Sequence, residues 1–184
     1  LQAGHAVTAT EHRGTALHAL CWHWDYGDER DDTTRAIVRM LLEAGVDPTA
    51  TCSNGNTALH ESVAGDGTNL VAATELLNAG ADVNARNNDG QTPLVYFYET
   101  LFDYGLVVPF LLQHGANPLV PNNRGKNAID IARQMIAGAN PDWRTEQWCG
   151  EDGPPCGWKQ PAEPGDEEHE MLDLLLKAAS RFGG

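Results

Sequence analysis

Apolar residues recur at spacings of three and four along several segments of the chain, which is the spacing of one buried helix face. Three segments show it well: TTRAIVRMLLEA from Thr33, TNLVAATELLNA from Thr68 and EMLDLLLKAAS from Glu170. Thr33 and Thr68 are of a residue type suited to capping the first two of these helices. A fourth segment, LVVPFLLQH, contains Pro109, which we expect in the first turn or at a kink, with a displaced helix start.

The helical segments end in a phrase that recurs four times. LQAGHAVTATEHRGTALH opens the chain, and related phrases begin at Leu41, Leu76 and Leu111. Each phrase carries two glycines ten residues apart, and the last three phrases are 35 residues apart. The glycine pairs are Gly4 and Gly14, Gly45 and Gly55, Gly80 and Gly90, and Gly115 and Gly125. The first glycine of each pair follows an apolar run, where glycine ends a helix at little cost, and the Asn, Asp and Thr after it favour tight turns.

These phrases resemble the ankyrin repeat, whose signature is Thr-Pro-Leu-His at the start of one helix and Leu-Leu-x-x-Gly-Ala-Asp-x-Asn at the end of the next. The first part is matched by Thr57-Ala58-Leu59-His60 and the second by LLNAGADVN from Leu76. The resemblance covers about residues 1–135 and 168–182. It implies an all-α solenoid of stacked helix-turn-helix units with β-hairpin or turn tips, about four repeats, and a long insertion in the last.

We expect a single domain over residues 1–184. Its parts are 1–13 as the end of a preceding repeat, 14–48 as repeat 1 with an insertion at 22–32, 49–84 as repeat 2, 85–119 as repeat 3, and 120–182 as repeat 4 with an insertion at 137–168. We interpret Leu1 to Gly4 as the last turn of a helix whose earlier part is missing, so we expect the chain to be a piece of a longer array or domain.

The insertion at 137–168 carries Trp143, Trp148 and Trp158 among prolines and acidic residues. Side chains of this size usually cover other surface, so we expect the segment to fold back on the last repeat. Two roles are open. The insertion caps the end of the stack, as terminal repeats require, or it is a recognition element.

The formal net charge of −14 excludes generic binding to a nucleic acid, because a phosphate backbone repels so acidic a chain. Residues 25–32 contribute −4 and residues 151–170 contribute −6, so two segments hold −10 of the −14. No apolar run approaches the roughly 18 residues that span a bilayer. We therefore expect a monomer that binds another protein, with no nucleic-acid partner and no membrane insertion.

The chemistry-bearing residues do not indicate catalysis. In the ankyrin repeat, the histidine of the Thr-x-Leu-His phrase bonds to the turn and to the threonine hydroxyl, so the resemblance implies structural roles for His18 and His60. Cys21 and His23 have a spacing seen in some metal sites, but no second Cys/His pair lies nearby in sequence to complete four ligands. No nucleophile elbow, phosphate-binding loop or zinc-protease helix occurs. We predict no enzyme activity, no metal and no cofactor.

The four cysteines do not form a disulfide framework at this chain length. Cys149 and Cys156 bracket a Gly/Pro-rich turn and are a possible disulfide in an oxidising compartment. The alternative is four reduced thiols. A bridge would indicate a periplasmic or secreted protein and reduced thiols a cytoplasmic one, so the sequence leaves the compartment open.

The resemblance implies a partner-binding surface made of the turn tips and the exposed side of the first helices. The tip residues are Thr10, His12, Arg13, Thr51, Ser53, Asn54, Asn56, Arg86, Asn88, Asp89, Gln91, Asn123, Arg124 and Lys126. The first-helix residues are Trp22, His23, Ala64, Glu99 and Thr100. Arg13, Arg86, Arg124 and Lys126 place basic groups along the tips of an acidic molecule, where they suit carboxylates of a partner.

The hypothesis that follows is non-catalytic recognition of a protein by a rigid repeat scaffold, with the binding side chains held in place beforehand. Two alternatives remain open. The acidic segments suit an inhibitor or immunity-type protein that blocks a basic protein or enzyme. The repeats also suit a structural spacer within a longer array.

Overall fold

The computed structural model describes residues 14–22, 31–64, 69–100, 104–136 and 166–183. These residues form helices joined by turns, and Thr51 and Thr57 form an isolated antiparallel bridge. The helices are α1 (Ala16–Trp22), α2 (Asp31–Glu43), α3 (Ala58–Ser62), α4 (Leu70–Asn78), α5 (Pro93–Thr100), α6 (Tyr104–Gln113), α7 (Ala128–Ile136) and α9 (Asp166–Ala179).

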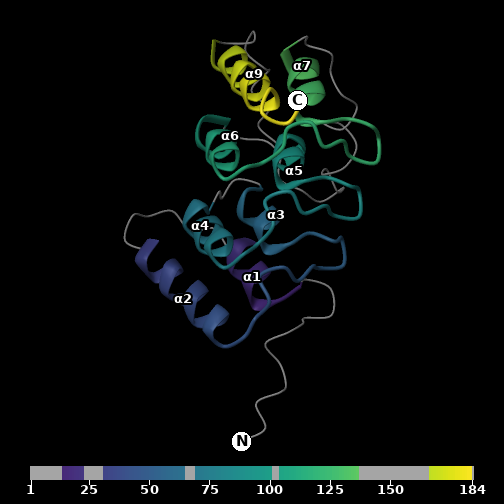
Figure 1. Ribbon diagram of the computed structural model, residues 1–184. Coiled ribbons are helices and arrows are strands. Elements are labelled where there is room, and N and C mark those ends of the chain that lie inside the picture. The colour runs from purple at the N-terminus through teal and green to yellow at the C-terminus, as the bar shows by residue number, and fades with distance from the viewer. Residues whose placement is uncertain (1–13, 23–30, 65–68, 101–103, 137–165, 184) are drawn as a thin grey trace, which may run out of the picture.

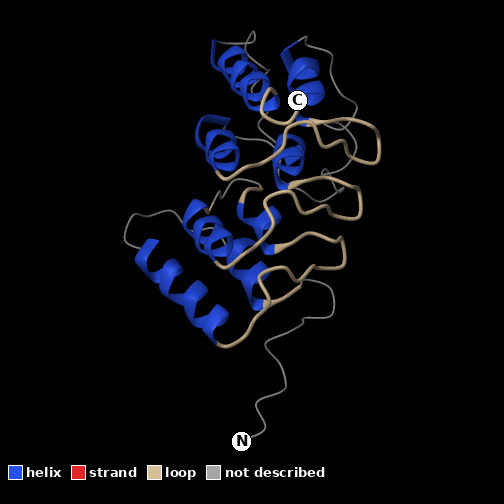
Figure 2. Ribbon diagram, viewed as in Figure 1, coloured by secondary structure: helices blue, strands red, loops and turns tan. Residues whose placement is uncertain are grey.

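The helices stack in two layers (Figure 1). The first helices of the pairs, α1, α3, α5 and α7, follow one another in one layer, and α2, α4, α6 and α9 form the other. The loops between the pairs project together to one side, beyond the layer of first helices (Figure 2). The predicted all-α solenoid of paired helices is therefore confirmed.

One apolar core runs through the stack between the two layers. Leu17, Leu59 and Leu94 occupy the same place in successive first helices, and each is at most 1% exposed. Equivalent positions in the second helices are held by Leu76, Leu111 and Leu175, and each of these side chains is 0% exposed. Full burial of such a side chain stabilises the fold by about 1.5–3 kcal/mol, so these rows hold neighbouring units together.

The helices α2, α4 and α6 end in the same capping motif, because a glycine after each adopts a left-handed conformation. The φ values of Gly45, Gly80 and Gly115 are 86°, 92° and 88°. In α4 the N–H of Gly80 donates to the carbonyl of Leu77 at 3.1 Å, and the N–H of Ala81 donates to that of Leu76 at 3.0 Å. These two bonds form a Schellman motif, which satisfies carbonyls that the helix end would leave unpaired.

The helix starts differ from the sequence prediction. Asn69 caps α4, because its side-chain oxygen accepts from the N–H of Ala72 at 2.9 Å, whereas Thr68 lies outside the described residues. Thr33 does not cap α2, since the helix begins two residues earlier, at Asp31. The predicted threonine caps are therefore not found, and asparagine, which is at least as good a cap, serves in α4.

Two acidic stretches that we assigned to insertions belong in part to helices. The predicted insertion 22–32 overlaps the last residue of α1 and the first two of α2, and the predicted insertion 137–168 overlaps the start of α9 at Asp166. Carboxylates in the first turn of a helix interact favourably with its positive end. Part of the clustered negative charge therefore belongs to residues at helix starts.

Pro109 lies inside α6 as its sixth residue, and not in the first turn, which was one of its two predicted placements. Its nitrogen would otherwise bond to the carbonyl of Gly105, so the lost bond falls at the start of the helix, where it disturbs few others. The start of α6 is not displaced either, since Tyr104 precedes Gly115 by 11 positions and Leu70 of α4 precedes Gly80 by 10.

Several predictions fall on residues outside those the structure describes. They are the end of a preceding repeat at 1–13, the tryptophans at 143, 148 and 158, and the possible Cys149–Cys156 disulfide. Within the described residues, none of the helices has the length and apolar character needed to cross a membrane.

We expect Gly80→Ala to lower the free energy of unfolding by about 1 kcal/mol, because a side chain disfavours the left-handed conformation at the end of α4. A Cβ at Gly80 would meet nothing within 4 Å, so the loss comes from the backbone alone. Urea denaturation checks it. Ala79→Gly, at the preceding exposed position, is the matched control. Ala79 has a φ of −84°, so this variant does not involve the strain of a side chain in the left-handed conformation.

Candidate functional site

Three turn tips project from the first-helix side of the stack, and each is a short hairpin. We call them tip 1 (52–56), tip 2 (87–91) and tip 3 (122–126). In each, the N–H of the first residue donates to the carbonyl of the fifth, at 2.9, 3.0 and 2.8 Å respectively. The fourth residue is a glycine, and its N–H donates to the carbonyl of the first residue at 2.9–3.0 Å. The repeated turn chemistry of the sequence therefore produces three equivalent loops.

The glycines also let neighbouring tips approach closely. Gly55 has a φ of 76°, and a Cβ placed there would lie 2.6 Å from the backbone nitrogen of Asn88 in the next tip. Gly90 has a φ of 74°, and its Cβ would meet the side chain of Asn123. A side chain at Gly55 would force adjacent tips apart, so the sequence needs glycine there for two reasons, whereas at Gly90 the side chains of Asn123 and Arg86 would have to move.

An asparagine ladder joins the tips. The backbone N–H of Asn88 donates to the carbonyl of Asn54 at 3.0 Å, and its side-chain amide donates to that of Ser53 at 2.9 Å. One repeat later, the N–H of Asn123 donates to the carbonyl of Asp89 and its amide to that of Asn88, both at 2.8 Å. Two directional bonds per junction hold each tip in a defined position relative to the next.

Beneath the tips, buried side-chain amides also bond to one another. The Nδ2 of Asn87 donates to the Oδ1 of Asn56 at 2.8 Å and to the Oε1 of Gln91 at 2.7 Å. Asn56 donates in turn to the carboxylate of Glu61 at 2.8 Å. Burial raises the pKa of Glu61, and the hydrogen bond from Asn56 opposes this effect. These polar groups satisfy one another, as buried polar groups must.

His18 and His60 connect the first helices to the following tips. The N–H of Thr15 donates to Nδ1 of His18 at 3.1 Å, so the proton sits on Nε2, which donates to the carbonyl of Asn56 at 2.9 Å. His60 repeats the arrangement with Thr57 at 3.2 Å and Gln91 at 3.0 Å. The structural role that the resemblance implied is confirmed, and it includes a bond to the next unit.

Burial decides the ionisation of His60 and of the nearby Cys21. It lowers the pKa of His60 from 6.5 to about 4, although the bond to Gln91 acts in the opposite direction. It raises the pKa of Cys21 to about 12, with a smaller contribution from the charge of Glu61. His60 is therefore neutral and Cys21 a protonated thiol near pH 7, whereas a thiolate is the form that attacks or binds metal.

The structure brings most of the described tip residues to one surface. The exposed ones are Thr51, Ser53, Asn54, Arg86, Asn88, Asp89, Asn123 and Arg124, and Lys126 is half-buried. Ala64, predicted on the first-helix side of the same surface, is half-buried in the turn that follows α3.

Two predicted tip residues do not reach this surface. Asn56 is 2% exposed and Gln91 is 6% exposed, because both belong to the buried amide chain beneath the tips. Their predicted contact with a partner does not fit this burial, and we leave them out of the surface.

The side chains of the remaining predicted residues lie outside the part of the chain that the structure describes. Thr10, His12, Arg13 and His23 lie outside the described residues, as do Cys149 and Cys156. The backbones of Trp22, Glu99 and Thr100 lie in helices, but their side chains are outside the described part.

Positive charge is concentrated on tips 2 and 3 and beside them. Arg86 donates from Nε to the carbonyl of Gly90 and from Nη2 to that of Pro121, both at 3.0 Å, so its guanidinium bridges the two tips. Arg124 is exposed and Lys126 half-buried. Among the described residues, none of these three cations forms an ion pair. They remain available to an acidic group.

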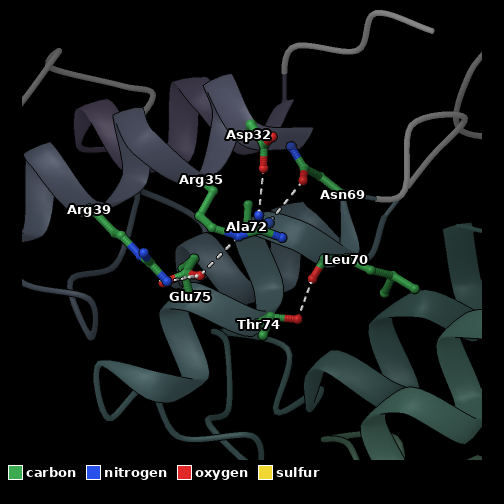
Figure 3. A network of polar contacts seen from close by, with 8 residues as sticks. All are labelled: Asp32, Arg35, Arg39, Asn69, Leu70, Ala72, Thr74 and Glu75. Carbon is green, nitrogen blue, oxygen red and sulfur yellow. Dashed lines mark hydrogen bonds and ion pairs between the residues drawn. The ribbon is translucent and has the colours of Figure 1, made fainter. Parts of the chain in front are cut away.

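Sequence reasoning missed the contacts on the opposite side, between α2 and α4 (Figure 3). Arg39 donates from Nε and Nη2 to the two carboxylate oxygens of Glu75, at 2.8 and 2.9 Å, and Arg35 Nε lies 3.4 Å from the same carboxylate. The hydrogen bonds from Arg39 lower the pKa of Glu75. Nothing local in the sequence signals this pair, because its members are 36 residues apart.

The asparagines of the ladder could have been found from sequence. Asn87 and Asn122 start the doublets of NNDG and NNRG, 35 residues apart. In each, the first asparagine accepts two backbone N–H groups of its own tip, and the second bonds to the preceding tip. Repeated doublets at the repeat period indicate a structural pair of this kind.

Comparison with known proteins agrees with the stacked helical pairs of the structure. A family model described as ankyrin repeats (3 copies) matches residues 31–122, which are 92 of the 184 residues. The chain is 35% identical over 115 residues to ankyrin repeat and SOCS box protein 16 of Mus musculus, covering 59% of the chain and 25% of that protein. It is 33% identical over 129 residues to the E3 ubiquitin-protein ligase KEG of Arabidopsis thaliana, covering 68% of the chain and 8% of that protein.

A third relative is smaller. The ankyrin repeat-containing protein P1E11.10 of Schizosaccharomyces pombe is 30% identical over 95 residues, which cover 52% of the chain and 43% of that protein. The matched segments therefore span less than half of each of these three relatives.

We expect Cys52→Asn to raise the free energy of unfolding by about 1 kcal/mol. Cys52 stands where Asn87 and Asn122 accept two backbone N–H groups each, at 2.9–3.1 Å, and sulfur is a weak acceptor. Urea denaturation measures the change. Cys52→Ala removes the thiol without supplying an acceptor, so an equal gain in that variant would contradict the explanation.

We expect stability to fall as the pH drops from 6.5 toward 4. The unfolded chain binds a proton at His60 near pH 6.5 and the folded chain only near pH 4, so protons favour unfolding. The stabilisation is complete above pH 6.5, and the loss attributable to His60 is roughly 3 kcal/mol by pH 4. Denaturation of the wild type and of His60→Ala across this range measures it. His114→Ala, at an exposed histidine, should keep the wild-type slope.

Proposed function

The chain belongs to the ankyrin repeat family, a non-catalytic protein-interaction fold, and we propose that it binds a protein partner through the surface of its tips. The observation that carries the proposal is the line of exposed, mutually bonded tips on one side of the stack. Side chains already held in place lose little freedom on binding, which favours association.

The charges support an acidic partner segment. Arg86, Arg124 and Lys126 carry three positive charges on and beside tips 2 and 3, and Asp89 is the acidic residue on these two tips. The rest of the molecule is strongly acidic, with a net charge of −14. An acidic segment of a partner would therefore be attracted to the tips and repelled elsewhere, which fixes its orientation.

The alternative of an inhibitor that acts through the acidic insertions has less support. Residues 25–30 and 151–165 lie outside the described part of the chain, and Asp31, Asp32 and Asp166 belong to helix starts. The alternative of a spacer has no observation of its own, because a spacer needs no unpaired cations at the tips.

We expect the double variant Arg124→Glu, Lys126→Glu to lose at least about tenfold in affinity for a partner captured by the wild type, equivalent to about 1.4 kcal/mol. Capture with mass spectrometry identifies the partner, and titration measures the affinity at two salt concentrations. Attraction between charges at the tips predicts weaker binding at higher salt.

Lys177→Glu, Arg181→Glu is the matched control, since it makes the same change in charge at exposed residues of the last helix and the turn after it. The proposal is wrong if both double variants bind alike, or if the partner binds the control less well than the tip variant. A gain in affinity in both variants, which the added negative charge would give with a basic partner, would instead favour the acidic insertions as the binding site.

A further inference from the structure

Tip 1 contains a chemically labile pair of residues. Asn54 is followed by Gly55, and this is the one Asn–Gly sequence in the 184 residues. The backbone nitrogen of the residue after an asparagine can attack the side-chain amide, and a glycine places no side chain in the way of that nitrogen. Asparagine is one of the thermolabile residues of proteins. In tips 2 and 3 the same positions hold Asp89–Gly90 and Arg124–Gly125, which lack an amide beside the glycine.

The side chain of Asn54 is accessible to water. It is exposed, and among the described residues its amide makes no hydrogen bond. The amides of Asn88 and Asn123 differ, because they donate to backbone carbonyls of the preceding tip at 2.9 and 2.8 Å. Asn54 therefore combines a glycine neighbour with an amide that no described residue holds in place.

The closed tip holds the attacking nitrogen away from this amide. The N–H of Gly55 donates to the carbonyl of Cys52 at 2.9 Å. The nitrogen attacks only after it has lost its proton and turned toward the side chain of Asn54, so this bond has to break first. The rate of the reaction therefore depends on how often tip 1 opens.

Tip 1 is closed less firmly than the other two tips. Asn87 in tip 2 and Asn122 in tip 3 each accept two backbone N–H groups of their own tip through Oδ1, at 2.9–3.1 Å. Cys52 stands at this position in tip 1, and a thiol is a weak acceptor of hydrogen bonds. The labile pair thus lies in the tip that opens most easily.

We propose that Asn54 is a site of spontaneous deamidation in the folded protein, and that Cys52 sets its rate by leaving tip 1 weakly closed. The nitrogen of Gly55 forms a bond to Cγ of Asn54, the bond from Cγ to Nδ2 breaks, and ammonia leaves with the proton that the Gly55 nitrogen gave up. Water then opens the resulting succinimide ring at either carbonyl. The products carry aspartate or isoaspartate at position 54.

Both products change tip 1. Each adds a negative charge to an exposed position, and isoaspartate also lengthens the hairpin by a methylene. The longer backbone moves the oxygen of residue 54 that accepts from the N–H of Asn88 at 3.0 Å, so the bond between tips 1 and 2 is weakened. Weaker binding of an acidic partner would follow, and this consequence alone rests on the proposed function.

The test is site-resolved mass spectrometry of the 184-residue chain during incubation at physiological temperature and mildly alkaline pH. We expect the amide at position 54 to become a carboxyl group faster than any other described asparagine. The rate should rise with pH, because the nitrogen of Gly55 reacts without its proton. Labelling with an isoaspartyl methyltransferase measures the isoaspartate. Asn54→Gln is the control and should give far less product, since its longer side chain closes a ring more slowly.

Variants at position 52 separate the closing of the tip from the chemistry of the pair. Cys52→Asn supplies the missing acceptor, so we expect the rate at position 54 to fall about fivefold as the open tip becomes rarer. Cys52→Ala supplies no acceptor and should keep the wild-type rate. In concentrated urea no tip forms, and all three chains should react at the same rate.

The proposal is wrong if Asn54 keeps its amide in the folded chain while it reacts in urea, or if Cys52→Asn and Cys52→Ala change the rate alike. A fivefold effect of Cys52→Asn that persists in urea would also overturn it, because residue 52 would then act without the tip. These rates are measured on the isolated chain, so a failure of the tips to bind a partner would leave them unchanged.

Discussion

Each helical pair of this chain has an apolar side that it cannot bury by itself, and covering that side with the next pair is the constraint on which the fold depends. Leu17, Leu59 and Leu94 are buried because a neighbour lies against them, and so are Leu76, Leu111 and Leu175. Stability is then close to a sum over units and junctions between units. Junctions between units combine buried apolar side chains with polar contacts such as that of Arg39 with Glu75.

Apolar burial has no preferred direction, so it does not determine how one unit is positioned on the next. Hydrogen bonds supply that register here. His18 and His60 bond to backbone carbonyls of the following tip, and Asn88 and Asn123 bond to those of the preceding one. These bonds depend on direction and distance, and so they place the exposed tip side chains as a set. A rigid recognition surface follows from the same contacts that order the stack.

Charge in this molecule has more than one structural use. Asp32 accepts a hydrogen bond from Arg35 within α2, and Glu75 joins α2 to α4 through Arg39. Arg86 is positioned by the backbone carbonyls of Gly90 and Pro121 and lies exposed at the surface. A net charge of −14 therefore coexists with a local positive surface at the tips.

The sequence by itself determined the class of fold, the closing glycines and the turn chemistry, because each depends on residues close together within a repeated phrase, and the resemblance to the ankyrin repeat implied the structural role of the two histidines. The tertiary structure decided the rest. It buried Asn56 and Gln91, made Asn69 a cap, kept Pro109 inside a helix, and paired Arg39 with Glu75 across 36 positions. These outcomes depend on which side chains meet when one unit lies on the next, and periodic patterns along the chain do not encode those meetings.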